Sequence, residues 1–273
     1  MAGKAASAPT IVMIGAGRMG AALVRGWLAA KTRSRIILID PTPSEEVSGW
    51  AEAGKVQLNP APQPADILIL CVKPQVFTSV VEDTSAFVGP KTLIVSVMAG
   101  ILMKQLAAAF DTPRVIRAMP NTPGAIGQGI TVITAPPGAD AADIEIVTGL
   151  LKPLGDVEGP IDEKLISAAA GVSGCGPAYV FLLAEVMAMA GEAEGLPKDL
   201  AARLARKTVE GAAALMASTG EAPDTLRKAV TSPKGVTQAA LDILMDEGGM
   251  PALMRKALRA AANRERDLSR QKD

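Results

Sequence analysis

Histidine is absent from this sequence of 273 residues. The absence removes the side chain that most often acts as a general acid or base near neutral pH, together with the Ser–His and Cys–His nucleophile systems. It also removes the commonest metal ligand. Any chemistry must therefore use another proton donor or need little proton transfer from the protein.

Cysteine and aromatic residues are also scarce. Cys71 and Cys175 are the only cysteines, and aromatic side chains make up 3% of the sequence. Two cysteines exclude a disulfide framework and cannot build a metal site by themselves, so we expect no metal cofactor. Few aromatic rings and equal numbers of basic and acidic residues, 28 of each, argue against a nucleic-acid-binding surface.

Long apolar runs are missing as well. No run reaches the roughly 18 residues that span a bilayer, and residues 66–72 are typical of a short buried strand in a parallel sheet. Residues 1–9 carry one lysine and no apolar segment, which argues against a signal peptide. We therefore expect a cytoplasmic protein that does not associate with membranes.

The first part of the sequence, residues 1–160, alternates short apolar runs with helical patterns. This alternation predicts an α/β domain with a doubly wound parallel sheet. The expected strands are 11–14, 35–39, 67–72, 92–97, 114–118 and 130–134, and the expected helices are 19–30, 44–53, 76–87, 102–110 and 141–151.

The second part, residues 161–273, lacks strand patterns and predicts an all-α domain. Many of its helix faces consist of Ala, Gly and Met, which permit close contact, so we expect this domain to bury apolar surface against a second copy. The expected helices are 178–193, 198–217, 225–230, 237–245 and 251–268.

A glycine-rich segment carries the strongest functional signal. Gly15, Gly17 and Gly20 follow the apolar run 11–14, and Asp40 ends the next expected strand. In a dinucleotide-binding turn the first glycine permits the tight turn, the second the approach of a pyrophosphate, and the third close packing of helix on strand. The helix N-terminus then faces the anion. The segment predicts binding of NAD(H) or NADP(H), against the alternative of a plain strand–helix turn.

Three further segments follow expected strands at the same edge of the sheet, where ligands bind in doubly wound folds. They are residues 71–74, 96–100 and 119–123. Each also has a structural explanation, such as a solvent-exposed lysine for Lys73 or an Asx turn for Asn121. Their clustering with the glycine turn favours function.

A loop late in the sequence, Ser-Pro-Lys-Gly-Val-Thr at 232–237, precedes a helix expected from about Gln238. Ser232 fits an N-cap and Pro233 the first helical position. Gly235 leaves the backbone accessible, so the N–H groups could hold a carboxylate. An ordinary capped helix is the alternative.

With these motifs, the sequence resembles the pyrroline-5-carboxylate reductases, enzymes of the last step of proline biosynthesis. The resemblance covers roughly residues 11–268. Besides the glycine turn with Met19, it rests on Val-Lys-Pro at 72–74, Arg-Ala-Met-Pro-Asn-Thr-Pro at 117–123, the stretch 171–179 and Val-Thr-Ser-Pro-Lys-Gly-Val-Thr at 230–237.

The resemblance implies a Rossmann-like domain followed by a helical dimerisation domain, with both chains contributing to each site. It implies hydride transfer from NAD(P)H to a cyclic imine, with loop amides on the substrate carboxylate and Thr237 near the ring nitrogen. Thr237 and Ser232 are accordingly assigned to catalysis. The residues assigned to the substrate are Ser232, Pro233, Lys234, Gly235, Val236, Thr237 and Asn121.

Three positions depart from the usual pattern of that family. Lys234 stands where a second glycine is common, Val236 where a small residue or threonine is common, and Cys175 replaces a frequent serine. Lys234 bears most on mechanism, because its side chain would either crowd the loop or add a cation near the carboxylate.

The residues themselves and the family resemblance favour different cofactors. Asp40 is the acid expected on a ribose 2′-hydroxyl and would repel a 2′-phosphate, whereas the resemblance often implies NADP(H) held by Thr42, Ser44 and Asn59. We therefore expect both dinucleotides to be accepted. The residues assigned to the cofactor are Ile14, Gly15, Ala16, Gly17, Arg18, Met19, Gly20, Asp40, Thr42, Ser44, Asn59, Cys71, Val72, Lys73, Pro74, Met98, Ala99 and Gly100.

Two alternatives stay open from the sequence. A dehydrogenase of the β-hydroxyacid or 6-phosphogluconate type would share the layout, but its Gly-x-x-x-Asn-x-x-Lys segment is not found here. The second alternative is a protein that senses the dinucleotide without catalysing a reaction. Such a protein would bind no substrate and would not need the 232–237 loop.

Overall fold

The computed structural model describes residues 8–270, so the expectation about a signal peptide lies mostly outside it. The chain forms two compact units. The sheet unit comprises the described residues up to Gly174 together with residues 261–270, and the helical unit is Cys175–Ala260. These compact units do not coincide with the expected domains 1–160 and 161–273, because the last helix contributes its second half to the sheet unit. The functional division at residue 160 stays a prediction.

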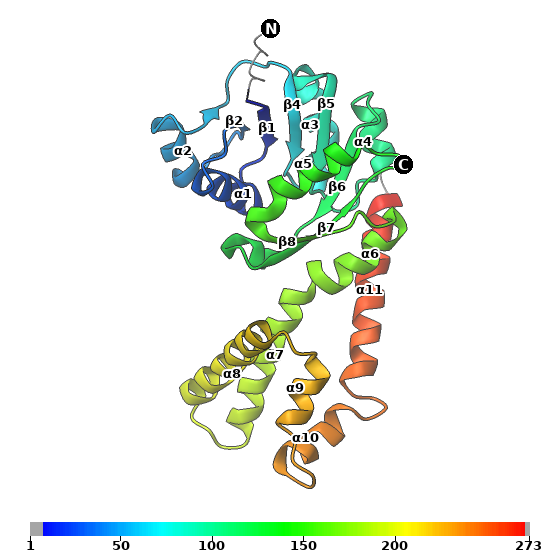
Figure 1. Cartoon of the computed structure of the whole chain (residues 1–273). Coiled ribbons are helices and arrows are strands. Elements are labelled where there is room, and N and C mark those ends of the chain that lie inside the picture. The colour runs from blue at the N-terminus through cyan, green and yellow to red at the C-terminus, as the bar shows by residue number, and fades with distance from the viewer. Residues whose placement is uncertain (1–7, 271–273) are drawn as a thin grey trace. The chain divides into compact units, whose positions relative to one another are not determined.

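The sheet unit is a doubly wound α/β fold, as expected (Figure 1). Its eight strands lie in the order β3-β2-β1-β4-β5-β6-β7-β8, so the strand order reverses beside β1. The strands are β1 (Thr10–Ile14), β2 (Arg35–Ile39), β3 (Gln57–Leu58), β4 (Ala65–Leu70), β5 (Val88–Ser96), β6 (Val115–Met119), β7 (Gly129–Thr134) and β8 (Gly155–Glu158).

Helices cover both faces of this sheet because successive strand residues point to opposite sides. Ile11 and Met13 face a cluster that includes α1 and α5, whereas Val12 and Ile14 face a cluster that includes α3 and α4. The α-helices of this unit before the boundary are α1 (Arg18–Ala29), α2 (Glu45–Glu52), α3 (Phe77–Thr84), α4 (Met103–Ala109), α5 (Ala141–Leu151) and α6 (Ile166–Ala169).

The expectation of a fully parallel sheet is wrong at one pair. Strand β7 runs antiparallel to β6, with Arg117 opposite Thr134. The connection holds only the short 3₁₀ helix η3 (Thr122–Ile126), which is too short for the crossover that parallel neighbours need. Strands β3 and β8 were not expected, because two residues and the sequence Gly-Asp-Val-Glu contain no apolar run.

The helical unit confirms the expected all-α fold. It contains α7 (Gly176–Ala193), α8 (Lys198–Thr219), α9 (Pro223–Ala229), α10 (Val236–Leu244) and the first half of α11 (Met250–Arg270). Only Ala201 and Ala205 are buried within Cys175–Ala260, while many large apolar side chains of this unit are exposed. Its helices are therefore formed, but most of their apolar surface is not covered within the chain.

One helical stretch has the length of a membrane span. A 3₁₀ helix (Glu163–Leu165), α6, a π-helical segment (Ala170–Gly174) and α7 form one stretch, Glu163–Ala193, which is long and apolar enough by composition to cross a bilayer. The absence of long apolar runs from the sequence predicts no such stretch. The stretch combines apolar residues with up to two charged ones in its most apolar window, and apolar helices that pack against protein have the same composition.

Candidate dinucleotide and substrate sites

The glycine turn between β1 and α1 has the expected geometry. Gly15 has φ +88°, a conformation that favours glycine, and its N–H donates to the carbonyl of Ile39 at 2.9 Å. A Cβ on Gly20 would lie 2.5 Å from the carbonyl oxygen of Gly15 and 2.9 Å from the sulfur of Met13. The tight turn at Gly15 and the close packing at Gly20 are thus confirmed.

Gly17 differs from these two glycines because nothing in the protein approaches it. A Cβ there would meet no atom within 4 Å. Gly17 is the N-cap of α1, which has no side-chain cap and no acidic residue in its first turn. The first N–H groups of α1, beginning at Arg18 and Met19, therefore point to an open helix N-terminus that suits an anion. Pyrophosphate binding there stays a prediction.

Asp40 is engaged in holding the glycine turn. Its carboxylate accepts the N–H of Ala16 at 2.8 Å and the N–H of Thr42 at 2.9 Å. Asn59, which follows β3 and has φ +48°, forms two hydrogen bonds with the main chain of Asp40. The Asn59 side-chain oxygen accepts the N–H of Asp40 at 2.9 Å, and the Asn59 side-chain nitrogen donates to the carbonyl of Asp40 at 2.8 Å. The bond to Ala16 was missed from the sequence, although β1 and β2 are adjacent and their ends meet.

A cavity of about 300 Å³ opens beside Asp40. It is lined by assigned residues, among them Ile14, Gly15, Asp40 and Val72, and by residues that were not assigned, Ile39, Pro41, Val76, Ser79, Val80, Asp83 and Thr84. Ser44 is instead the N-cap of α2 and accepts the N–H of Val47 at 3.4 Å. Its assignment to the cofactor stays a prediction.

The loops after β4 and β5 lie beside the glycine turn, as expected. The N–H of Cys71 donates to the carbonyl of Ile14 at 2.8 Å, and the N–H of Val97 donates to the carbonyl of Leu70 at 3.0 Å. Lys73 is exposed and precedes the 3₁₀ helix η1 (Pro74–Val76). Met98 and Gly100 are buried, and Ala99 between them is half-buried.

Cys71 is not a nucleophile. Burial raises the pKa of its thiol to about 12, only partly offset by a hydrogen bond with the backbone of Gly20. The thiolate, which is the reactive form, is therefore negligible near neutral pH. Cys71 contributes packing against the glycine turn.

The side-chain amide of Asn121 forms hydrogen bonds through both its nitrogen and its oxygen inside the sheet unit. It donates to the carbonyl of Ser173 at 3.1 Å and accepts the N–H of Ile130 at 3.0 Å. The amide thus fixes the turn between β6 and β7. Neither interaction is the local Asx turn that was the structural alternative, and its assignment to the substrate stays a prediction.

The late loop of the helical unit departs from the expected cap. Helix α10 begins at Val236, and its N-cap is Gly235, not Ser232. Ser232 begins a turn in which its carbonyl accepts the N–H of Gly235 at 3.0 Å. Lys234 lies within this turn at φ +60°, which explains why glycine suits the position. A serine is a good N-cap by residue type, but the turn moves the N-cap three residues onward, to Gly235, and the helix begins close to its expected start near Gln238.

The start of α10 is open, as is the start of α1. Its first turn has no side-chain cap and no acidic residue, and Val236 is 92% exposed. Ser232, Pro233, Lys234 and Thr237 are also exposed. Loop backbone and hydroxyl groups are therefore accessible to a carboxylate-bearing molecule.

The described residues contain no group of three or more His, Cys, Asp or Glu side chains that could hold a metal ion. The residues assigned to the cofactor lie in the sheet unit, whereas the 232–237 loop belongs to the helical unit.

Comparison with known proteins agrees with both units. Residues 163–268 match the family model for pyrroline-5-carboxylate reductase dimerisation, and residues 10–100 match a model described as NADP oxidoreductase, coenzyme F420-dependent. The chain is 38% identical over 270 residues to a pyrroline-5-carboxylate reductase of Pseudomonas aeruginosa, covering 97% of this chain and 98% of that one.

Other relatives point the same way. A pyrroline-5-carboxylate reductase of Arabidopsis thaliana is 36% identical over 266 residues, covering 94% of each chain. A structure of the enzyme from Coxiella burnetii superposes with a TM-score of 0.85 at 31% identity, covering 96% of this chain and 98% of that chain.

The doubly wound fold, the glycine turn and the match of residues 10–100 to an NADP oxidoreductase model together define the class as an oxidoreductase that binds a nicotinamide dinucleotide. The relatives, which match over nearly the whole length, narrow this class further. The chain belongs to the pyrroline-5-carboxylate reductase family. These relatives do not favour a β-hydroxyacid-type dehydrogenase or a dinucleotide sensor.

Proposed function

We propose that the protein reduces 1-pyrroline-5-carboxylate to proline with NADPH or NADH. The observation that carries the proposal is full-length similarity to reductases of this name, at 38% and 36% identity. The open N-terminus of α10 adds a physical reason, because its free N–H groups suit the carboxylate of the substrate.

The late loop is proposed to bind and orient the imine. The backbone N–H groups at the start of α10 hold the carboxylate, with Ser232 and Gly235 shaping the turn below them. Holding the ring at reaction distance accounts for much of the rate through positioning. Asn121 contributes by fixing the turn between β6 and β7, since its amide is already bonded on both sides.

Thr237 is proposed to orient the ring nitrogen or to donate a proton to it. The dinucleotide, when bound, supplies the hydride that adds to the imine carbon. The nitrogen gains one proton, either from water or through the Thr237 hydroxyl, and the product is a secondary amine. This balance needs no histidine, in keeping with the composition.

Both dinucleotides are proposed as cofactors. Asp40 disfavours a 2′-phosphate by its charge, yet its carboxylate already accepts two backbone N–H groups and is less available to a ribose. Asp40→Asn keeps an acceptor for Ala16 and removes the charge. We expect it to raise the NADPH-to-NADH ratio of kcat/KM about tenfold, and an unchanged ratio would show that Asp40 does not face the 2′ position.

A second copy of the chain is proposed to cover the helical unit. An apolar groove of about 640 Å³ between α7 and α8 is lined by Val180, Phe181, Ala184, Ala188, Met189 and Val209, among others. The groove lies in the segment that matches the dimerisation model. Location in the cytoplasm stays a prediction.

The test is the initial rate of NADPH and NADH oxidation with racemic 1-pyrroline-5-carboxylate, followed by identification of proline in the product. We expect turnover with both dinucleotides. No oxidation of either at saturating imine would overturn the proposal. Strict dependence on NADPH would leave the reaction standing and correct only the cofactor.

A further inference from the structure

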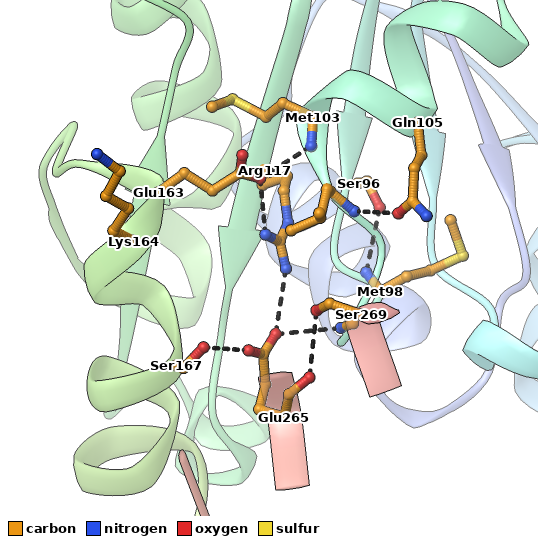
Figure 2. Close-up of polar contacts among 12 residues, drawn as sticks. Ser96, Met98, Met103, Gln105, Arg117, Glu163, Lys164, Ser167, Glu265 and Ser269 are labelled. Carbon is orange, nitrogen blue, oxygen red and sulfur yellow. Dashed lines mark hydrogen bonds and ion pairs between the residues drawn. The ribbon is translucent and has the colours of Figure 1, made fainter. Parts of the chain in front are cut away.

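A buried cation on β6, Arg117, contacts the carboxylates of Glu163 and of Glu265 on α11, next to the loop that follows β5 (Figure 2). The Arg117 side chain is 1% exposed. Its Nη1 lies 2.8 Å from Oε1 of Glu163, and its Nη2 lies 3.4 Å from Oε1 of Glu265, whose side chain is 7% exposed. One guanidinium thus holds two carboxylates that would otherwise repel each other.

The same two carboxylates hold the backbone of the loop between β5 and α4. Oε1 of Glu265 accepts the N–H of Gly100 at 3.2 Å, and Oε1 of Glu163 accepts the N–H of Met103 at 2.8 Å. Gly100 has φ +68°, and a Cβ there would lie 2.8 Å from Cβ of Leu268 on α11. The loop is therefore fixed at two points by acceptors that Arg117 orients.

Glu265 is itself held by further hydrogen bonds. The Ser167 hydroxyl donates to its second carboxylate oxygen, so both oxygens are engaged. Ser269 Oγ donates to its carbonyl at 3.1 Å, one turn along α11 (Figure 2). The second half of α11 thus brings a fixed acceptor to the edge of the sheet.

We expect the loop held in this way to lie beside one half of a bound dinucleotide. In a doubly wound sheet the two nucleotide halves lie on either side of the point where strand order reverses, which here is beside β1. Asp40, directly after β2, is the residue expected on the adenosine ribose, so β4 and β5 are expected on the nicotinamide side. Met98 and Gly100 follow β5 and therefore lie on the same side of the strand-order reversal as β4 and β5.

We propose that Arg117, Glu163 and Glu265 are positioning residues that set the 97–102 loop against the nicotinamide half of the dinucleotide. The proposal rests on the proposed function for the identity of the cofactor. The three residues act through the loop backbone and do not touch the reacting atoms. Binding energy at this loop thereby depends on a side chain from α11, a helix that also forms part of the helical unit.

The test compares Glu265→Gln with a matched ion pair near the other end of β6. Arg114 precedes β6 and binds Asp143 of α5 through two side-chain bonds, and the Asp143 side chain is 7% exposed, the same as that of Glu265. Asp143→Asn therefore removes a carboxylate charge of similar burial far from the loop. Melting temperature, the Kd of NADPH and NADH by nucleotide fluorescence, and the KM of the imine are measured for both variants.

We expect both variants to lower the melting temperature, but only Glu265→Gln to raise the dinucleotide Kd, by about tenfold, and to lower kcat, while the KM of the imine stays within a factor of about two. Glu265→Asp, which keeps the charge, should recover part of the loss. Arg117→Lys should act like Glu265→Gln, because an ammonium does not reproduce the fork that spans two carboxylates.

An equal rise of Kd in both variants, or a lower melting temperature in Glu265→Gln with an unchanged Kd, would overturn the proposal. If Glu265→Gln does not fold, Glu163→Gln carries the test with the same expectation, since the Glu163 side chain is 23% exposed. Absence of imine reduction by the unmodified protein would instead contradict the proposed function. The Kd measurement needs no imine and separates the two failures.

Discussion

The two units of this chain differ most in how they bury their apolar side chains. In the sheet unit, clusters fill both faces of the sheet, and residues such as Ile11, Leu23 and Ile94 are 0% exposed. In the helical unit, Phe181 is 67% and Met189 is 62% exposed. Leaving several large apolar side chains in water forgoes roughly 1.5–3 kcal/mol each. The sheet unit holds a complete core, whereas the helical unit holds part of one.

Each unit also contains a helix that begins with an open N-terminus after a glycine N-cap. Helices α1 and α10 both begin after a glycine N-cap, Gly17 and Gly235, with no side-chain cap and no acid in the first turn. The nearby left-handed residue is Gly15 in the first case and Lys234 in the second. Two open helix N-termini are thus built alike, but only the second carries a cation at its left-handed position.

The largest effect should come from a charge in the uncovered face of the helical unit. Phe181→Glu would place a carboxylate in the apolar groove of α7 and α8, and burying it against a second copy costs about 3 kcal/mol or more, over 100-fold in the dissociation constant. We expect monomers in sedimentation velocity and loss of imine reduction, with dinucleotide binding by the sheet unit retained.

Ile146→Glu is the matched control for this change. Ile146 lies on α5 of the sheet unit and is 43% exposed. We expect the variant to keep both its assembly state and its activity. Dimers of Phe181→Glu at micromolar concentration would show that the groove is not the contact surface.

The next effect tests whether the helical unit contributes to chemistry as well as assembly. Thr237→Val removes the hydroxyl at nearly constant volume, and we expect kcat to fall about 100-fold if the group acts as an acid on the ring nitrogen. Thr237→Ser should recover most of the rate. Steady-state kinetics from pH 6 to pH 9 (about the working range of such assays) provide the measurement, and equal kcat in all three proteins would remove Thr237 from the mechanism.

A smaller effect separates two glycines of the sheet unit. Gly17→Ala meets open space, so we expect an unchanged melting temperature and a dinucleotide Kd about tenfold higher. Gly20→Ala would clash with Gly15 and Met13, so we expect a lower melting temperature. Nucleotide fluorescence and thermal melts check this contrast. An unaltered Kd in Gly17→Ala would mean that no phosphate approaches this residue.

The features that could be predicted from the sequence are those set by residues close together in the chain. Apolar runs such as 11–14 gave the central strands, and the spacing of Gly15, Gly17 and Gly20 gave the turn, because these signals are local. Strand β7 was expected at 130–134, but its antiparallel direction was not, because a 3₁₀ connection leaves no clear pattern. Strand β8 was not expected, because it is short and weakly apolar.

Parts of the site were beyond local patterns for a further reason. The bonds of Arg117 to Glu163 and Glu265 join residues 46 and 148 positions apart. No spacing rule connects them, because only the fold brings β6 beside α11. The N-cap at Gly235 was missed because the turn that begins at Ser232 needs a left-handed conformation at Lys234. A lysine rarely adopts that conformation, so the sequence did not indicate the turn.

The smallest expected effect comes from replacing Lys234, the left-handed residue before the open N-terminus of α10. Lys234→Gly relieves the backbone strain of φ +60°, about 1 kcal/mol. The glycine loses a similar amount of free energy as conformational entropy on folding, so we expect little change in melting temperature.

Lys234→Gly also removes a cation beside the start of α10. An exposed charge of this kind contributes up to about 1 kcal/mol, so the KM of the imine should rise about two- to fivefold. Because salt screens exposed charges, the KM of the unmodified protein should rise with sodium chloride more steeply than that of Lys234→Gly. Lys234→Asn, which tolerates the left-handed conformation and lacks the charge, should match the glycine variant. If all three proteins show the same KM and the same salt dependence, Lys234 does not act on the carboxylate, and the helix ends of the two units work alike.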